Sequence, residues 1–157
     1  VLAMIASEEL SIPISKIKVI NTDTDVKPWD VGVHASRTSF VAGNSLLGAL
    51  NKLKQKLNRK ASELLKTPIE KLEYSNEEIR SSENNSSVRI EKAAREIHFS
   101  PPNKLCTETY FYEPSSSFQD KEYKGNVSGA YAFAAQAVKV EVDTYTGNVK
   151  VLDVYVA

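Results

Sequence analysis

Cysteine is almost absent from this chain, because Cys106 is the only one among its 157 residues. One cysteine cannot form an internal disulfide, and alone it cannot hold a zinc ion or an iron–sulfur cluster. A reducing, cytoplasmic setting is therefore expected. Cys106 lies in a strand-like stretch, which favours a role as a small residue of the core.

The sequence also lacks an excess of charge and a long apolar run. Lys and Arg total 20 and Asp and Glu total 20, so the net charge is zero. This balance offers no electrostatic attraction for nucleic acid or an anionic membrane surface, and neither is an expected partner. No apolar run reaches the roughly 18 residues of a membrane helix. The apolar residues 1–6 form too short a run for a signal peptide.

Both ends of the chain indicate a piece of a longer protein. The sequence opens inside an apolar, helix-favouring run at residues 1–10 and closes inside a strand-like run at residues 149–156. Natural termini are more often polar and frayed. We therefore expect residues 1–157 to be a fragment, long enough to form a single domain with its own core.

One long helix gives the clearest pattern. Apolar residues recur at spacings of three and four, which predicts an amphipathic helix over about residues 38–66 that Thr67-Pro68 ends. The residues on this face are Leu46, Leu50, Leu53, Leu57, Ala61 and Leu64. Shorter helices are predicted over residues 1–10 and around residues 90–97.

Several stretches read as strands. Alternating apolar residues predict strands over Lys16–Asn21 and Cys106–Tyr112, and hairpins with turns at Asn76-Glu77 and at residues 144–147. In the second hairpin the alternation of apolar and polar residues breaks between Val151 and Leu152, which predicts either a bulge or burial of both faces of the strand. Residues 114–125 are expected to form a flexible loop. Together the elements predict an α+β fold, with a long amphipathic helix packed on a mixed, largely antiparallel sheet.

The junction before the long helix is the strongest candidate site. A helix N-terminus offers backbone N–H groups and a partial positive charge. Small residues at Ala35 and Ser36 permit a ligand to approach the backbone, Ser36 and Thr38 add hydroxyl groups, and Arg37 adds a cation suited to phosphate. The alternative is a plain helix start, with Ser36 or Thr38 as the N-cap and an exposed arginine.

Other candidates favour structural roles. Gly43 and Gly48 each cost the long helix about 1 kcal/mol relative to alanine, which predicts close packing against another element. The run Asn21-x-Asp23-x-Asp25 lacks the glycine and glutamate of a calcium loop, so Asx turns are expected. Trp29 is expected to anchor its loop to the core, and the alternative is that it helps to line a pocket formed with missing partners. His34 and His98 have no matching ligand spacing, and structural roles are expected for both.

Taken together, these segments resemble the molybdenum-binding part of xanthine dehydrogenase and aldehyde oxidoreductase-type enzymes. The resemblance rests on Ile5–Pro13, Asn21–Asp25, Pro28–Gly32, Ala35–Asn44, Ala130–Gln136, Val140–Asp143 and Thr146-Gly147, which agree with the family in order and spacing. The Ala-Ser-Arg-Thr segment followed by Gly-Asn is the most specific of them.

The resemblance implies a cofactor and partners. Residues Ala35, Ser36, Arg37 and Thr38 would wrap the pterin and phosphate part of the molybdenum cofactor, a molybdopterin that can carry a cytosine dinucleotide. The chain would be a partial molybdenum-cofactor-binding domain, completed by the remainder of the molybdenum subunit. Separate subunits or domains would carry iron–sulfur clusters and FAD. The family hydroxylates aromatic heterocycles or aldehydes with oxygen from water, and some members instead reduce an aromatic hydroxyl group on an aryl-CoA.

The resemblance also implies that the active site is incomplete here. The family's glycine–glutamine–glycine cofactor segment would lie before Val1, and its catalytic glutamate would lie after Ala157. No residue of this chain is therefore expected to be catalytic or to bind the metal, and the isolated chain is expected to be inactive. The alternative function is a non-catalytic α+β binding or assembly module that contacts a partner through the polar loops 76–87 and 114–125.

Overall fold

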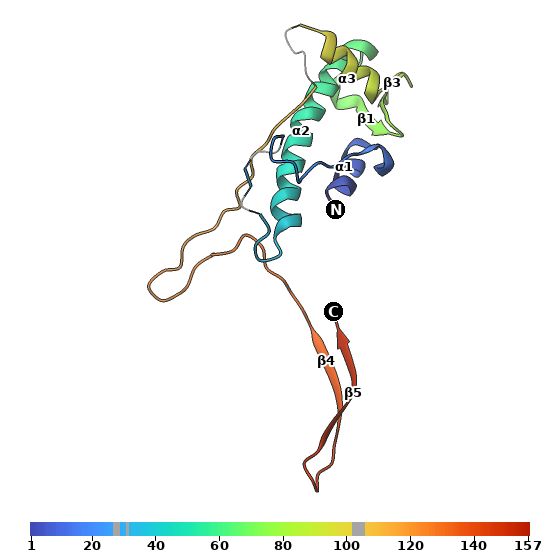
Figure 1. The fold of residues 1–157 in the computed structure, drawn as a ribbon. Helices are drawn as coiled ribbons and strands as arrows, with labels where there is room; N and C mark the ends of the chain where they lie inside the picture. The colour runs from blue at the N-terminus through green and yellow to red at the C-terminus, as the bar shows by residue number, and fades with distance from the viewer. Residues whose placement is uncertain (27–28, 31, 102–105) are drawn as a thin grey trace. The chain divides into compact units, whose positions relative to one another are not determined.

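The computed structural model describes residues 1–26, 29–30, 32–101 and 106–157, in two units, Val1–Pro114 and Ser115–Ala157. The elements of the first unit are α1 (Leu2–Leu10), η1 (Ile14–Lys16), α2 (Thr38–Leu65), η2 (Ile69–Lys71), β1 (Leu72–Ser75), β2 (Glu78–Ser81), β3 (Ser87–Arg89) and α3 (Ile90–Phe99). The second unit carries β4 (Gln136–Val142) and β5 (Val149–Val156) (Figure 1). The predicted α+β class is confirmed, and every described strand pairing is antiparallel.

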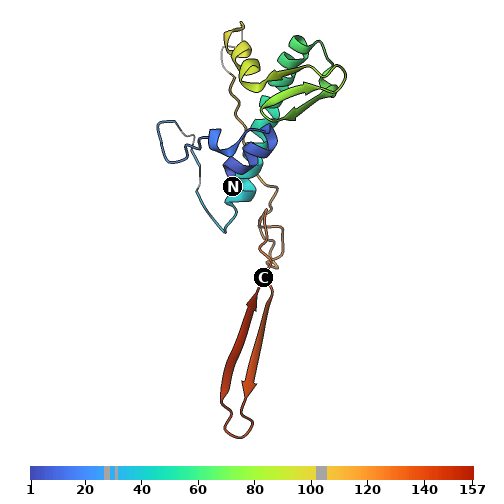
Figure 2. The same cartoon turned by 90° about the vertical axis from the view of Figure 1, so that its right-hand side faces the viewer.

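The long helix α2 organises the first unit. It spans 28 residues, close to the predicted range, and ends where Lys66 adopts a left-handed φ of 51°. Its buried side chains, Leu50, Leu57 and Ala61, belong to the predicted apolar face. Figure 2 shows α1 lying against α2, and the two helices are in contact. The helix thereby buries one face in the core and leaves its N-terminal turn outside it.

The three-stranded sheet β1–β2–β3 packs against α2. Asn76 and Glu77 both have positive φ, 50° and 66°, as a two-residue turn between right-twisted strands requires. The predicted first hairpin is therefore confirmed as β1–β2, and β3 pairs with the other edge of β2. Ile79 of β2 is fully buried together with residues of α2 and α3.

The strand predicted over Lys16–Asn21 is wrong. Pro13 instead starts the 3-10 turn η1, in which the Lys16 amide donates to the Pro13 carbonyl. Only Ile17 of the expected apolar set packs against the core, while Val19 and Ile20 are exposed. Alternation alone could not make a strand, since no described strand pairs with this segment.

The second unit consists of a hydrogen-bonded loop and a hairpin. Between Lys139 and Val140 the register shifts, so that Leu152 has no partner and the predicted bulge is confirmed. Gly147 has the left-handed φ of 76° that the turn needs. Residues 114–125 form no helix or strand, as expected, but the Ser117 amide donates to the Asn126 carbonyl and closes the loop. Every side chain of β4 and β5 is exposed, so the alternative of burial on both faces is wrong.

Candidate functional site

The predicted anion site lies where the loop enters α2. The helix begins at Thr38, with Arg37 as the N-cap at φ −89° and ψ 5°, and no side chain caps it. The expectation that Ser36 or Thr38 would be the N-cap is therefore wrong. Ser36 has a left-handed φ of 54°, whereas a capping side chain acts from extended backbone, and Thr38 is already helical. Among the described residues, no side chain therefore caps the amide groups of the N-terminal turn.

Two neighbouring residues before the helix have a strained backbone. Ala35 and Ser36 have φ of 50° and 54°, a region that costs a residue with a side chain about 1–2 kcal/mol. Arg37 returns to negative φ, and its amide donates to the His34 carbonyl at 3.1 Å. The Arg37 amide is engaged in this bond, and the turn can direct the neighbouring N–H groups toward one concave surface, which suits an anion.

The charge of this junction suits an anion as well. The first turn of α2 contains no acidic residue, so no carboxylate of that turn opposes the positive end of a 28-residue helix. Ala35, Ser36 and Thr38 are exposed, and Arg37 is half-buried. Backbone amides, two hydroxyl groups and a guanidinium thus gather within four residues. The residues present fit the phosphate end of a cofactor.

A segment that was predicted to be a strand supports this helix instead. Cys106–Tyr112, called here the strap, runs along α2 and forms no strand, so that prediction is wrong. Side chains of α2 donate hydrogen bonds to the backbone carbonyl groups of the strap. These bonds take the place of those that a neighbouring strand would supply. These bonds are Ser45 Oγ to Tyr110 O at 2.7 Å, Lys52 Nζ to Thr109 O at 3.1 Å and Lys56 Nζ to Thr107 O at 3.1 Å.

Two aromatic rings of the strap pack against the N-terminal half of α2. A Cβ atom at Gly48 would lie 2.2 Å from Cδ1 of Tyr110, so only glycine admits this ring. Nearer the helix start, the rings of Phe40 and Tyr112 meet edge to face with centroids 5.9 Å apart. A Cβ atom at Gly43 would lie 3.3 Å from Ile5 Cδ1. The close packing predicted for both glycines is confirmed, although the sequence did not identify the strap as the partner.

Of the remaining predictions for the loop before α2, the Asx turn is confirmed and the anchoring role of Trp29 is wrong. The Asx turn is confirmed, because the Asp25 amide donates to Oδ1 of Asp23 at 3.0 Å. Trp29 does not anchor its loop, since 85% of it is exposed. Pro28, which belongs to the family resemblance, lies outside the described residues. No group of three potential metal ligands was found within the described part of the chain.

Cys106 behaves as the sequence predicts. It is half-buried at the start of the strap and packs against the core. Burial raises the pKa of its thiol, the negative charge of Glu108 adds to this effect, and Lys56 opposes it. The neutral thiol is therefore the form that the fold favours.

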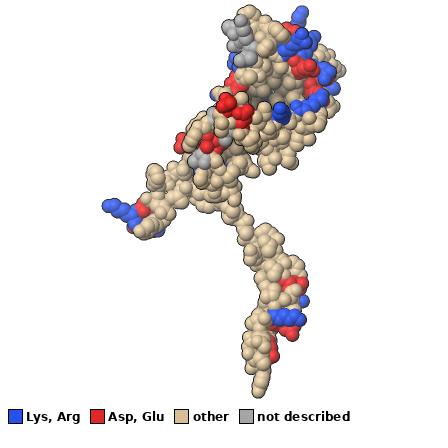
Figure 3. All heavy atoms as spheres, viewed as in Figure 1, with Lys and Arg blue, Asp and Glu red and all other residues tan. Residues whose placement is uncertain are grey.

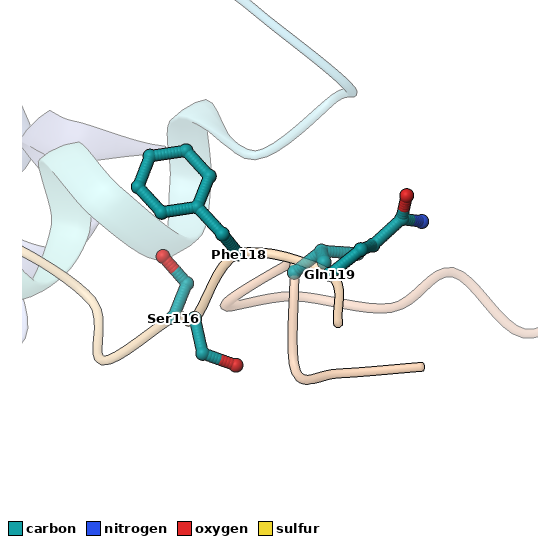
Figure 4. Close-up of a pocket in the computed structure, with 5 residues that line it drawn as sticks. Ser116, Phe118 and Gln119 are labelled. Carbon is teal, nitrogen blue, oxygen red and sulfur yellow. The ribbon is translucent and has the colours of Figure 1, made fainter. Parts of the chain in front are cut away.

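Among the described residues, neither the charged side chains visible in Figure 3 nor the hollow of the second unit gives a further candidate site. In Figure 3 the basic side chains of the first unit are interleaved with acidic ones. Glu77, for example, pairs with both Lys16 and Arg89. In the second unit a hollow of about 490 Å³ is lined by Ser116, Ser117, Phe118, Gln119 and Val127. Figure 4 shows Phe118 and Gln119 leaving the loop in different directions, and Phe118 is fully exposed, so the Phe118 side of the hollow is open to solvent.

Known proteins share this architecture and sequence. A family model described as a molybdopterin cofactor-binding domain matches residues 1–157. A putative xanthine dehydrogenase molybdenum-binding subunit of Escherichia coli (strain K12) is 41% identical over 66 residues, which cover 41% of this chain and 9% of that protein. The gamma subunit of the 6-hydroxypseudooxynicotine dehydrogenase complex of Paenarthrobacter nicotinovorans is 28% identical over 154 residues, 97% of this chain and 18% of that protein.

A solved structure agrees in fold. The Cu,Mo-CO dehydrogenase superposes with a TM-score of 0.73 at 24% identity, over 99% of this chain and 18% of that one. At this identity the likeness shows the fold alone. The family model, in contrast, matches the sequence over its full length. The chain therefore belongs to the molybdopterin cofactor-binding domain family. It spans less than a fifth of the length of these relatives. In the described residues, no helix is long and apolar enough to cross a membrane.

Proposed function

We propose that this chain is the part of a molybdenum-dependent oxidoreductase that holds the phosphate and pterin end of the cofactor, through Ala35, Ser36, Arg37 and Thr38. The observation that carries the proposal is the pair of left-handed residues directly before the uncapped start of α2. Strained backbone of this kind persists where the surroundings impose it, and it is frequent at ligand sites. Membership of the molybdopterin-binding family supplies the identity of the ligand.

Each residue would contribute in a different way. The left-handed turn at Ala35 and Ser36 presents backbone N–H groups, and the hydroxyl groups of Ser36 and Thr38 donate to phosphate oxygens. Arg37 adds a charge and up to two parallel hydrogen bonds to the same group. The positive end of α2 favours the bound negative charge by about 0.3–1 kcal/mol at an exposed site. When bound, the cofactor would supply the redox centre for hydroxylation with oxygen from water, or for the reverse reduction.

The larger assembly follows from the same proposal. Both units would belong to one molybdopterin-binding domain, completed by the remainder of the molybdenum subunit. Iron–sulfur and FAD subunits would carry electrons in a cytoplasmic complex, and the cofactor could carry a cytosine dinucleotide. The substrate would be an aromatic heterocycle, an aldehyde or an aryl-CoA. The gamma-subunit name of one relative supports a multi-subunit arrangement.

Replacing Arg37 tests the loop directly. In the complete protein, Arg37→Ala removes a charge-assisted contact worth about 1.5–3 kcal/mol, and we expect about tenfold to a hundredfold weaker retention of cofactor. Molybdenum and pterin are measured per subunit after dialysis. Arg59→Ala is the matched control, because Arg59 is exposed on the same helix, about 33 Å farther along its axis. Equal retention in both variants and the unmodified protein would remove Arg37 from the site.

A further inference from the structure

The first turn of α2 carries the proposed cofactor loop but receives little support from the core. Thr38, Ser39 and Phe40 are exposed, and the first buried residue of the helix is Gly43. Helix ends fray when packing does not hold them. An anion site built from amide groups depends on their fixed direction, so another segment has to hold this turn in place.

The strap reaches this turn from the other end of the helix. It begins beside Lys56, continues past Lys52 and Ser45, and arrives at Phe40 with the ring of Tyr112. The interplanar angle of 80° and the centroid distance of 5.9 Å describe an edge-to-face pair, a geometry that aromatic rings prefer. Tyr112 is half-buried, so this contact is shielded in part from water.

The strap itself is fixed along its length. Lys52 Nζ lies 5.3 Å from the centroid of the Tyr110 ring, and that ring fills the space left by Gly48. Lys56 also pairs with Glu108 at 2.6 Å. Because several contacts set its position along α2, the strap can hold Tyr112 at one place beside the first turn.

We propose that Tyr112 is a positioning residue for the cofactor loop, holding Phe40 and with it the start of α2 in the conformation that binds the cofactor phosphate. The inference rests on the proposed function. Tyr112 does not touch the cofactor in this scheme. It acts through Phe40, which lies three residues after Arg37.

The test measures cofactor release from the complete, loaded protein. Molybdenum and pterin are followed over time after dilution, in Tyr112→Leu, Phe40→Leu, the double variant and Tyr112→Phe. We expect each Leu variant to release cofactor about twofold to tenfold faster, the range that one aromatic pair corresponds to. The double variant should be no faster than the worse single variant, since both changes remove the same contact. Tyr112→Phe keeps the ring and should restore slow release.

A matched control separates positioning from general destabilisation. Ile79→Val removes one methyl group from a fully buried residue of β2 and lowers stability by a similar amount, about 0.5–1.5 kcal/mol. We expect its release rate to equal that of the unmodified protein. Equal release in Tyr112→Leu and the unmodified protein, or equally faster release in Ile79→Val, would overturn the inference. Phe40→Leu gives the same reading if Tyr112→Leu does not fold. Normal release in Tyr112→Leu from a protein that holds the cofactor would refute the positioning role alone, whereas a folded, intact protein without molybdenum and pterin would refute the proposed function.

Discussion

Substitution of Gly48 by alanine has two opposing effects on stability: it raises helix propensity, and it disturbs the packing of Tyr110. In an exposed helix this change stabilises by about 1 kcal/mol. Here the new Cβ atom would lie 2.2 Å from Cδ1 and 2.5 Å from Cγ of Tyr110, so the ring must move. A displaced ring loses its contact with Lys52, about 0.5–1 kcal/mol, and strains the Ser45 bond to the Tyr110 carbonyl, about 1 kcal/mol. Adding about 1 kcal/mol for overpacking and subtracting the gain in helix propensity, we expect net destabilisation of about 1.5–2 kcal/mol.

Amide hydrogen exchange in the complete protein measures this effect locally. Peptides that cover α2 and the strap report the free energy of opening in that region. Gly43→Ala is the control, because its Cβ atom would meet only Ile5 Cδ1 at 3.3 Å, the end of a flexible side chain. We expect Gly43→Ala to be neutral or stabilising. In a Tyr110→Ala background the space is open, and Gly48→Ala should then stabilise by about 1 kcal/mol. A stabilising Gly48→Ala in the unmodified background would refute the packing argument.

Two further predictions concern the core and its edge. Leu57→Ala empties a site that is 1% exposed, and we expect a loss of about 2–5 kcal/mol in local stability, measured by hydrogen exchange over α2. The raised pKa of Cys106 predicts slow alkylation by iodoacetamide in mildly alkaline buffer and fast alkylation after unfolding; equal rates would contradict the burial of this thiol. Because the fold favours the neutral thiol, its contribution to stability is complete below the unfolded-state pKa and decreases as the pH rises through the alkaline range.

Elements with a local pattern could be predicted from the sequence. The apolar spacing of α2 fixes its face, Thr67-Pro68 marks its end, and Asn76-Glu77 supplies the positive φ of the first hairpin turn. These features depend on residues close in the chain, so one sequence contains the whole signal. The bulge at Leu152 followed in the same way from a broken alternation.

Elements that depend on distant partners could not be predicted. Lys16–Asn21 and Cys106–Tyr112 both alternate like strands, but a strand exists only when another strand pairs with it. The strap instead uses donors from the side chains of α2, more than fifty residues earlier. Gly48 was the sequence signal of this contact, because a glycine inside a helix lowers stability and therefore indicates close packing against another element.

The sequence predicted which chemical groups the candidate site contains, but it did not predict the backbone conformation of the loop that carries them. Hydroxyl groups and an arginine before a strong helix indicated an anion site at Ala35–Thr38. The left-handed conformation of Ala35 and Ser36 had no local signal, since neither residue is a glycine or an asparagine. Such strain is imposed by the surroundings, and the sequence of the loop alone does not encode it.

The molybdenum and pterin content of the complete protein, purified without added cofactor, tests the central claim most directly. We predict close to one molybdenum atom and one pterin for each copy of this chain. A folded, intact complex that contains neither would contradict the assignment of this chain to cofactor binding.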